Sequence, residues 1–298
     1  MSVLTVGETM ALLDPVADGP AAIGAEFRLR IAGAESNVAI GLARLGVAVT
    51  WVSRLGRDPF GDLVLEAVAA EGVDVRFVVR GDGRTGLFAK VRARGRTEVA
   101  YWREGSAASR LGPRDVPDEA LESVRLVHLT GITMAISETG AALVVDLARR
   151  AKERGITVLF DPNFRPALPD SPEAAATRSR AVLPYVDWYL CGEDERRLLW
   201  GDEPVPVPCV VRVGARGALV EGETVPPARP VATVVDEVGA GDAFAAGFIY
   251  GLLQEWPPRA CAQAGNLLAG FTLGGTGDWE LLPRLGEVAG DLRAIAAA

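Results

Sequence analysis

The stretch Asp236–Phe248, DEVGAGDAFAAGF, places three small residues directly before an acidic residue and an apolar helical run. The small residues at 239–241 leave neighbouring backbone N–H groups open at a helix N-terminus, where an anion such as a phosphate group binds readily. Asp242 fits a helix-start acid, which the helix dipole favours. The bare backbone before it favours a further interpretation, in which the carboxylate takes a proton from an attacking hydroxyl group.

Other phosphate-binding loops fit this stretch less well. A Walker loop needs a Gly-Lys-Ser/Thr run, and the chain contains no Gly-Lys pair. A Rossmann fingerprint needs a small residue where Phe244 stands, and it usually follows the first strand instead of lying near the C-terminus. A nicotinamide dehydrogenase is therefore a distant alternative.

Strand-like and helix-like stretches alternate outward from this motif. VLTVG, VRLVHLTG and ITVLFDPN show the pattern of buried strands, whereas SNVAIGLARLG and DPFGDLVLEAVAAEG show that of helices closed by glycine. Such alternation predicts an α/β fold, with a mostly parallel central sheet and helices on both of its faces. We expect residues 1–298 to form a single domain of this kind.

Two stretches break the alternation. EFRLRIAG, from Glu26, and TGLFAKVRARGRTEVAYW, from Thr85, show strand periodicity with no helix between strands. They predict a small β-flap, formed by residues 11–32 and 75–102 and inserted in the α/β domain. Ligands of open α/β sheets bind beyond the carboxyl ends of the strands, so the flap would act as a lid. Its exposed edges also favour pairing with another subunit, and we expect a homo-oligomer.

Composition excludes several classes of protein. The formal net charge of −8 argues against a nucleic-acid-binding protein, which usually carries a basic stripe. No apolar run reaches the roughly 18 residues of a membrane span, and no signal peptide is recognisable at the N-terminus. Three scattered cysteines show neither metal-site spacing nor a disulfide framework, which favours the cytoplasm. His128 is the only histidine, which excludes a mechanism built on a histidine pair.

Two separated stretches carry a resemblance to a known family. DEVGAGDAFAAGF resembles the C-terminal signature of the ribokinase-like sugar kinases (the PfkB family), which reads Asp-Thr-x-Gly-Ala-Gly-Asp. AGAESNVAIGLARLG, from Ala32, resembles the family's other signature, a Gly-Gly pair followed by an Asn that opens a helix. The resemblance covers essentially the whole chain. It implies a ribokinase-like three-layer sandwich with a β-flap lid, and transfer of a phosphoryl group from ATP to a sugar hydroxyl with the help of Mg²⁺.

The resemblance also implies roles for individual residues. Asp242 would be the catalytic base, and the amides of Gly239, Ala240 and Gly241 would form an anion hole. The other implied contacts are Gly33 and Asn37 with the sugar, Gly214, Gly217, Gly239, Gly241 and Asn266 with ATP, Glu195 with Mg²⁺ through water, and Asp236 with a monovalent cation such as K⁺.

Three positions depart from the family pattern. Ala34 replaces the second Gly of the pair, Gly192 replaces the Asn of an Asn-x-x-Glu motif, and Glu237 replaces a common Thr. Without that Asn, magnesium would depend more on phosphates and water, which it retains readily. The departure at Gly192 also leaves open a non-catalytic protein that senses a sugar or nucleotide.

Two arginine-containing stretches bear on the substrate. YWREGSAASRL places Tyr101 and Arg103 at the end of a flap strand, and DPNFRP places Arg165 just beyond a central strand. Arginine binds a carboxylate through two parallel hydrogen bonds, which favours an acidic sugar over a neutral hexose. Alternatively, Arg165 could hold the transferred phosphate.

Both stretches resemble 2-keto-3-deoxygluconate kinases within the family. The resemblance implies phosphorylation of 2-keto-3-deoxygluconate at its terminal hydroxyl, with Tyr101, Arg103 and Arg165 recognising the acidic sugar. Phe88 would lie over the sugar, or it would belong to the core of the flap. The alternatives are a fructokinase and a kinase for the 2-keto-3-deoxygalactonate epimer.

Overall fold

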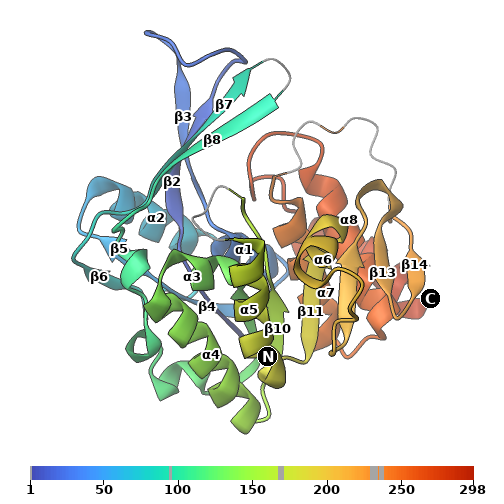
Figure 1. The fold of residues 1–298 in the computed structure, drawn as a ribbon. Coiled ribbons are helices and arrows are strands. Elements are labelled where there is room, and N and C mark those ends of the chain that lie inside the picture. The colour runs from blue at the N-terminus through green and yellow to red at the C-terminus, as the bar shows by residue number, and fades with distance from the viewer. Residues whose placement is uncertain (1, 94–95, 167–170, 229–233, 235–237) are drawn as a thin grey trace.

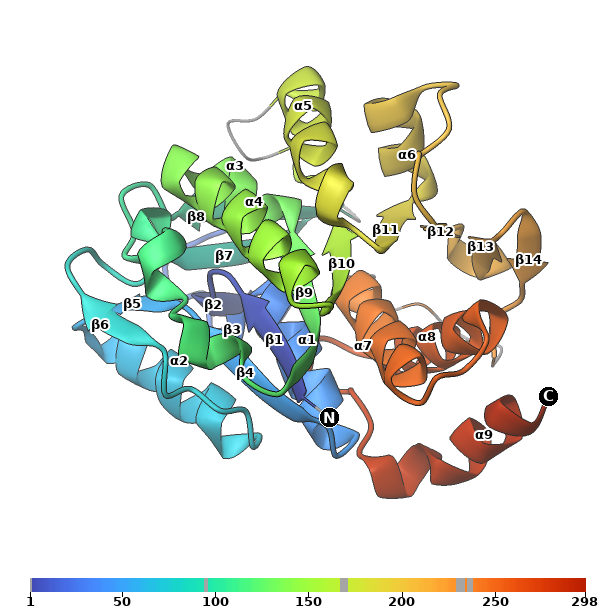
Figure 2. The ribbon, with the colours of Figure 1, turned by 90° about the horizontal axis from the view of Figure 1, so that it is seen from below.

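The structure is a computed structural model that describes residues 2–93, 96–166, 171–228, 234 and 238–298. Its described residues form three layers, with a central sheet between two layers of helices (Figures 1 and 2). The strands of this sheet are β1 (Ser2–Val6), β4 (Ala48–Val52), β9 (Val124–Thr130), β10 (Thr157–Asp161), β11 (Trp188–Gly192), β12 (Cys209–Arg212), β13 (Ala218–Val220) and β14 (Glu223–Val225). They confirm the predicted α/β fold class.

The strands lie in the order β14-β13-β12-β11-β10-β9-β1-β4. All neighbours from β12 to β4 are parallel, and only β13 and β14 are antiparallel additions at one edge of the described sheet. Parallel strands covered on both faces read as continuous apolar runs, which explains their clear sequence signal. His128 lies in β9 and is 1% exposed, and burial lowers its pKa to about 3. The single histidine is therefore a neutral core residue.

Helices cover both faces of the sheet (Figure 2). Because alternate strand residues point to opposite faces, each face has its own apolar cluster, with Val3 in one and Leu4 in the other. On the Val3 side lie α1 (Ala34–Arg44), α2 (Pro59–Ala70), α7 (Ala240–Leu253), α8 (Pro258–Thr272) and α9 (Leu285–Ala297). On the Leu4 side lie α3 (Gly131–Ile136), α4 (Glu138–Glu153), α5 (Pro172–Val182) and α6 (Glu193–Trp200).

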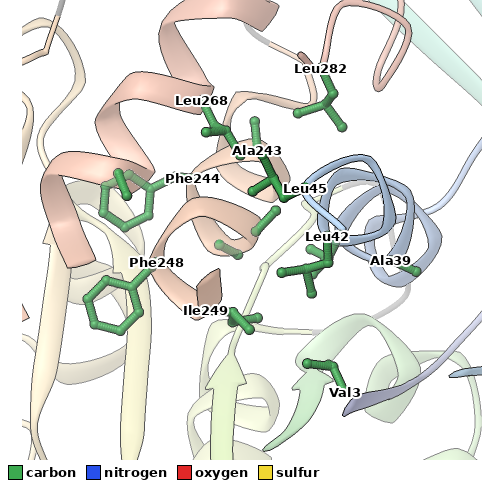
Figure 3. Packing of buried hydrophobic residues seen from close by; sticks show 14 of the residues in the cluster. Val3, Ala39, Leu42, Leu45, Ala243, Phe244, Phe248, Ile249, Leu268 and Leu282 are labelled. Carbon is green, nitrogen blue, oxygen red and sulfur yellow. The ribbon is translucent and has the colours of Figure 1, made fainter. Parts of the chain in front are cut away.

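Helix α7, which follows the DEVGAG stretch, is packed on nearly every side. Figure 3 shows Phe244 and Phe248 of α7 beside Leu268 of α8, with Leu42 of α1 on another side of the same helix. A helix that is apolar all round is a buried one. This packing fixes the N-terminus of α7 next to the N-terminus of α1, where the two signature stretches meet. No helix within the described ranges is both long and apolar enough to cross a membrane.

The flap is a separate sheet that stands out from the three layers (Figure 1). Its strands are β2 (Met10–Pro15), β3 (Phe27–Ala32), β7 (Leu87–Ala93) and β8 (Arg96–Trp102), in the order β3-β2-β7-β8. The predicted flap segment 75–102 contributes to this sheet only from Leu87. Before that point, β6 (Val79–Gly81) pairs with β5 (Arg54–Gly56) outside the flap.

Candidate active site

Polar side chains gather where the parallel strands end, at the carboxyl edge of the sheet. Each of β1, β9, β10, β11 and β12 is followed or ended there by a polar residue that is at least half-buried. These residues are Glu8, Thr130, Asp161, Asn163, Glu195 and Arg212. The N-termini of α1 and α7 add Asn37 and Asp242 to the same place, as the hydrogen bonds between their side chains show. Parallel topology thus assembles one site from residues that are far apart in the sequence.

Asp242 lies at the centre of this site. It is 6% exposed, and its two carboxylate oxygens accept hydrogen bonds from Asn37 Nδ2 at 2.8 Å and Asn163 Nδ2 at 3.3 Å. Burial raises the pKa of Asp242 to about 7, although the Asn37 hydrogen bond and the charge of Arg165 oppose the rise. A carboxylate that titrates near neutral pH is suited to general base catalysis.

The small residues before Asp242 form the start of α7. Gly239 has a left-handed φ of 84°, and a Cβ atom placed on it would lie 2.1 Å from the backbone oxygen of Asp278. Only glycine fits both conditions. Gly239, Ala240 and Gly241 are half-buried, so their backbone groups are not closed off by the core. Of the predicted site residues, Asp236 lies outside the described residues, and so does Glu237.

Arg212 links three parts of the site and was not predicted. Its guanidinium pairs with both oxygens of Asp161, at 2.6 and 3.1 Å, and with Glu195 Oε2 at 3.3 Å. It also donates to the backbone oxygen of Gly241 at 3.2 Å. Burial disfavours the charge, but the two carboxylates hold the pKa of Arg212 above its ordinary value. Arg212 therefore places a permanent positive charge beside the start of α7.

Glu195 is already engaged by several donors. Its Oε1 accepts from the Phe164 N–H at 2.7 Å, and its Oε2 accepts from the Gly192 N–H at 2.6 Å as well as from Arg212. In the part of the chain that the structure describes, no group of three His, Cys, Asp or Glu side chains could hold a metal ion. The described residues thus offer no dedicated magnesium cage, and a role for Glu195 through water stays a prediction.

The flap side of the site contains the predicted Arg103 together with Glu8, which was not predicted. Arg103 Nη2 pairs with Glu8 Oε2 at 2.5 Å, and Ser106 Oγ donates to Glu8 Oε1 at 2.6 Å. The Arg103 guanidinium also lies 5.7 Å from the centre of the Tyr101 ring. Glu8 is 2% exposed, so it holds the Arg103 guanidinium from the buried side of the site.

The remaining predicted sugar residues lie in different surroundings. Phe88 stacks on Tyr101 with ring centres 5.6 Å apart, but it is 5% exposed and belongs to the apolar cluster of the flap. This matches the flap-core alternative, and a contact of Phe88 with the sugar stays a prediction. Arg165 is exposed beyond β10, where its charge acts on Asp242. Gly33 precedes α1, and its Cα lies against the backbone oxygen of Glu8.

Several buried polar atoms in this region have no hydrogen-bond partner within the described residues. They are Glu35 Oε2, Asn37 Oδ1, Arg103 Nε and Asn163 Oδ1. Buried polar atoms nearly always have a partner in a folded protein, so a group of exceptions in one place indicates a polar ligand. Glu35, a further residue that was not predicted, is fully buried and accepts from Thr130 and Thr133 at 2.5 and 2.7 Å. Burial raises its pKa.

The remaining predicted ATP residues, Gly214, Gly217 and Asn266, lie after β12 and in α8. Gly217, between β12 and β13, has a φ of 91° and lies against the backbone oxygen of Val225. The Asn266 side chain donates to the backbone oxygens of Val225 and Pro226, both at 3.0 Å. Asn266 thus fixes the chain after β14, while its contact with adenine stays a prediction. Gly214 also has a positive φ, of 58°.

At this edge of the sheet, a helix N-terminus lies under the flap and beside a carboxylate whose pKa is about 7. This arrangement is that of an enzyme that transfers a phosphoryl group to a hydroxyl. The chain belongs to the pfkB family of carbohydrate kinases, whose sequence profile matches residues 1–284.

Individual relatives agree with this assignment. The chain is 33% identical over 312 residues to a 2-dehydro-3-deoxygluconokinase of Bacillus subtilis (strain 168), covering 99% of this chain and 96% of that one. It is 34% identical over 317 residues to a 2-dehydro-3-deoxygluconokinase of Thermoproteus tenax, covering 99% and 95%. The crystal structure of a PfkB protein from Polaromonas sp. JS666 superimposes with a TM-score of 0.86 at 37% identity, covering 97% of this chain and 99% of that one.

Proposed function

We propose that this kinase transfers the γ-phosphoryl group of MgATP to the terminal hydroxyl of 2-keto-3-deoxygluconate. The observation that carries the proposal is Asp242, a buried carboxylate with a pKa near 7 at an open helix N-terminus, held between two asparagine side chains. The 2-dehydro-3-deoxygluconokinases among the relatives act on a substrate of this name. The buried polar atoms without partners fit a ligand with several hydroxyl groups.

The chemical step follows from these residues. In its ionised form, Asp242 takes the proton of the attacking hydroxyl late in a loose transfer. The N–H groups of residues 239–241 stabilise the negative charge that moves with the phosphoryl group. Arg212 offsets one of the two negative charges of Asp161 and Glu195, which would otherwise repel the phosphates more strongly. Asn37 and Asn163 keep the carboxylate of Asp242 oriented toward its proton.

ATP would lie along Gly214, Gly217 and Asn266, with its phosphates at the start of α7. Magnesium usually binds through one or two carboxylates together with substrate phosphates, so Glu195 would hold it through water. When bound, the ion would neutralise phosphate charge. We further propose that the enzyme uses a monovalent cation such as K⁺, for which the predicted contact, Asp236, is outside the described residues.

The substrate's carboxylate would be recognised by Arg103 and Arg165, with Tyr101 beside it. Glu8 holds Arg103 by its ion pair at 2.5 Å, which leaves the other guanidinium nitrogens for the ligand. The flap sheet, formed by β2, β3, β7 and β8, would close over the sugar and exclude water, which limits wasteful hydrolysis of ATP. The three free cysteines fit a reducing compartment, and we place the reaction in the cytoplasm.

A coupled assay for ADP release tests this function. 2-Keto-3-deoxygluconate, its galactonate epimer and fructose are compared at equal concentrations, and the phosphorylated position is determined by NMR. We expect the gluconate compound to give the highest kcat/KM, with phosphate on its terminal hydroxyl. A higher kcat/KM for fructose would contradict the acidic-sugar assignment. Tight binding of sugar and nucleotide without any ADP release would instead indicate a non-catalytic binding protein.

We also propose that two copies of the chain associate through the flap. One face of the flap sheet exposes large apolar side chains, with Phe27, Leu29 and Trp102 at 37, 49 and 59% exposure. The register of the flap strands places all three on the same face, opposite the buried cluster that contains Leu12 and Phe88. Large apolar side chains exposed on one face are typical of an interaction surface.

Sedimentation of the whole chain tests this association. We expect the parent protein to sediment as a dimer or a larger assembly, and Leu29→Glu to shift it to the mass of one chain. Leu198→Glu is the matched control, because Leu198 is also 49% exposed but lies on α6, away from the flap. A parent protein with the mass of one chain would refute the proposal.

A further inference from the structure

The segment 278–282, between α8 and α9, touches the flap at three points. Lys90 Nζ of β7 donates to Asp278 Oδ1 at 2.7 Å. The ring nitrogen of Trp279 donates to the backbone oxygen of Ile31 in β3 at 3.1 Å. Arg30 of β3 forms an ion pair with Glu280. Two flap strands are therefore attached to this segment by polar contacts.

The same segment also supports the start of α7. The backbone oxygen of Asp278 lies 2.1 Å from the position that a Cβ atom of Gly239 would occupy. Asp278 thus packs directly against the first residue of the proposed anion hole. From behind, Arg44 of α1 donates to the backbone oxygens of Trp279, Glu280 and Leu282, at 3.1, 3.1 and 2.7 Å. The segment is held on both sides, and Asp278 lies between the flap and Gly239.

Lys90 is an unusual residue for this position. It is 1% exposed. It is also one of only two lysines among the 31 lysine and arginine residues of the chain. Taking an ammonium group out of water is costly even when it is paired, and apolar replacements of buried pairs are often as stable. The Lys90–Asp278 pair is therefore better explained by the geometry that it imposes than by stability.

We propose that Lys90 is a positioning residue for phosphoryl transfer, which couples the flap to the anion hole through Asp278. The inference rests on the proposed assignment of the anion hole to residues 239–241. When β7 of the flap is seated, Lys90 holds Asp278 and Asp278 holds Gly239 in place. Because coupling between two binding sites is reciprocal, a nucleotide at the start of α7 stabilises the closed flap, and a sugar under the flap stabilises the nucleotide site.

Lysine acetylation followed by mass spectrometry tests the coupling in the unmodified protein. Lys90 is buried while the flap is seated, so its acetylation rate reports how often it becomes exposed, whereas Lys152 lies on the surface with its side chain 46% exposed and serves as the internal control. We expect a non-hydrolysable ATP analogue, without sugar, to slow acetylation of Lys90 by about fivefold or more and to leave Lys152 unchanged.

Two results of this experiment would contradict the proposal, and they have different consequences for the proposed function. An analogue that binds in a separate titration but leaves the acetylation rate of Lys90 unchanged overturns the coupling and spares the proposed function. An analogue that does not bind at all overturns the proposed nucleotide site, and the inference with it.

A pair of variants supplies an independent kinetic readout. Lys90→Met combined with Asp278→Asn removes both charges of the pair together, so neither of the two is left buried without the other. We expect its kcat to fall about tenfold to a hundredfold, since small misplacements cost that much. We also expect its KM for ATP at saturating sugar to rise, because the sugar no longer stabilises the nucleotide site. Lys152→Met, the matched control, should keep the parent's kcat. A folded double variant with the parent's kcat would refute the positioning role, and if the double variant fails to fold, the acetylation result decides.

Discussion

Replacing Asp242 by asparagine tests the proposed base most directly. The substitution keeps the size of the side chain and can retain the hydrogen bond from Asn37, but it removes the group that accepts the proton. We expect both substrates to bind and kcat to fall by about 10²- to 10⁴-fold, the usual contribution of a positioned general base. A variant with kcat within about tenfold of the parent's would refute the assignment.

The pH dependence of the parent enzyme gives a second test of the same residue. Because the base must be ionised, we expect kcat to be low in acid and to rise with pH around a midpoint of about 7. Asp242→Asn should lose this rise. The profile is measured with ADP release at saturating substrates, and a parent profile that is flat between pH 5 and 8 would contradict the reasoning.

The same shift predicts a stability change, with the sign fixed by its direction. Burial raises the pKa of Asp242 from 3.8 to about 7, so the unfolded chain loses this proton at lower pH than the folded one. Stability therefore falls as pH rises through this window, by at most about 4 kcal/mol. We expect Asp242→Asn to show no such loss. Its free energy of unfolding in urea, relative to that of the parent, should therefore increase from pH 4 to pH 8. A difference in the free energy of unfolding that decreases over that range would contradict the raised pKa of Asp242.

Three further substitutions separate the parts of the site. Arg165→Ala should lower kcat/KM for the sugar acid by about tenfold to a hundredfold and affect fructose much less, whereas equal losses would remove the carboxylate contact. Gly239→Ala should nearly abolish turnover because its Cβ meets Asp278, while Gly155→Ala, with a φ of 69° and no atom within 4 Å, should cost only about 1–2 kcal/mol of stability. Arg212→Met should lower the free energy of unfolding by about 3–5 kcal/mol in urea titrations, since it leaves its carboxylate partners buried without a counter-charge. A change below about 1 kcal/mol would mean that those partners are solvated.

The elements that could be predicted from the sequence are those whose place in the fold is reflected in a local pattern of residues. The buried parallel strands, the flap strands β3, β7 and β8, and the start of α7 could all be predicted, because apolar runs, alternation and small residues are local features. Asn37 and Asp242 were predicted from separate stretches, and the structure brings them within 2.8 Å. Helix α5 was missed, since its alanine- and arginine-rich run carries only a weak apolar stripe.

The residues that were missed act through partners far away in the chain. Arg212 is one arginine among many, and its role arises only because β12 lies beside β11 and β11 beside β10, which brings Asp161 and Glu195 to it. Glu8 and Asn163 had an available signal, because each follows a buried parallel strand at the edge where ligands bind. Glu35 had none, since a glutamate on the first turn of a helix is ordinarily a solvated residue.

The contact between Asp278 and Gly239 has a consequence for the order in which the protein is made. A ribosome completes the whole signature stretch, including Asp242, well before it reaches residue 278. Until segment 278–282 emerges and Arg44 holds it, the backbone of Gly239 lacks the contact with Asp278 that packs against it. We therefore expect kinase activity to appear only after synthesis has reached segment 278–282. Nascent chains stalled at increasing lengths should show kinase activity only after this segment has left the ribosome.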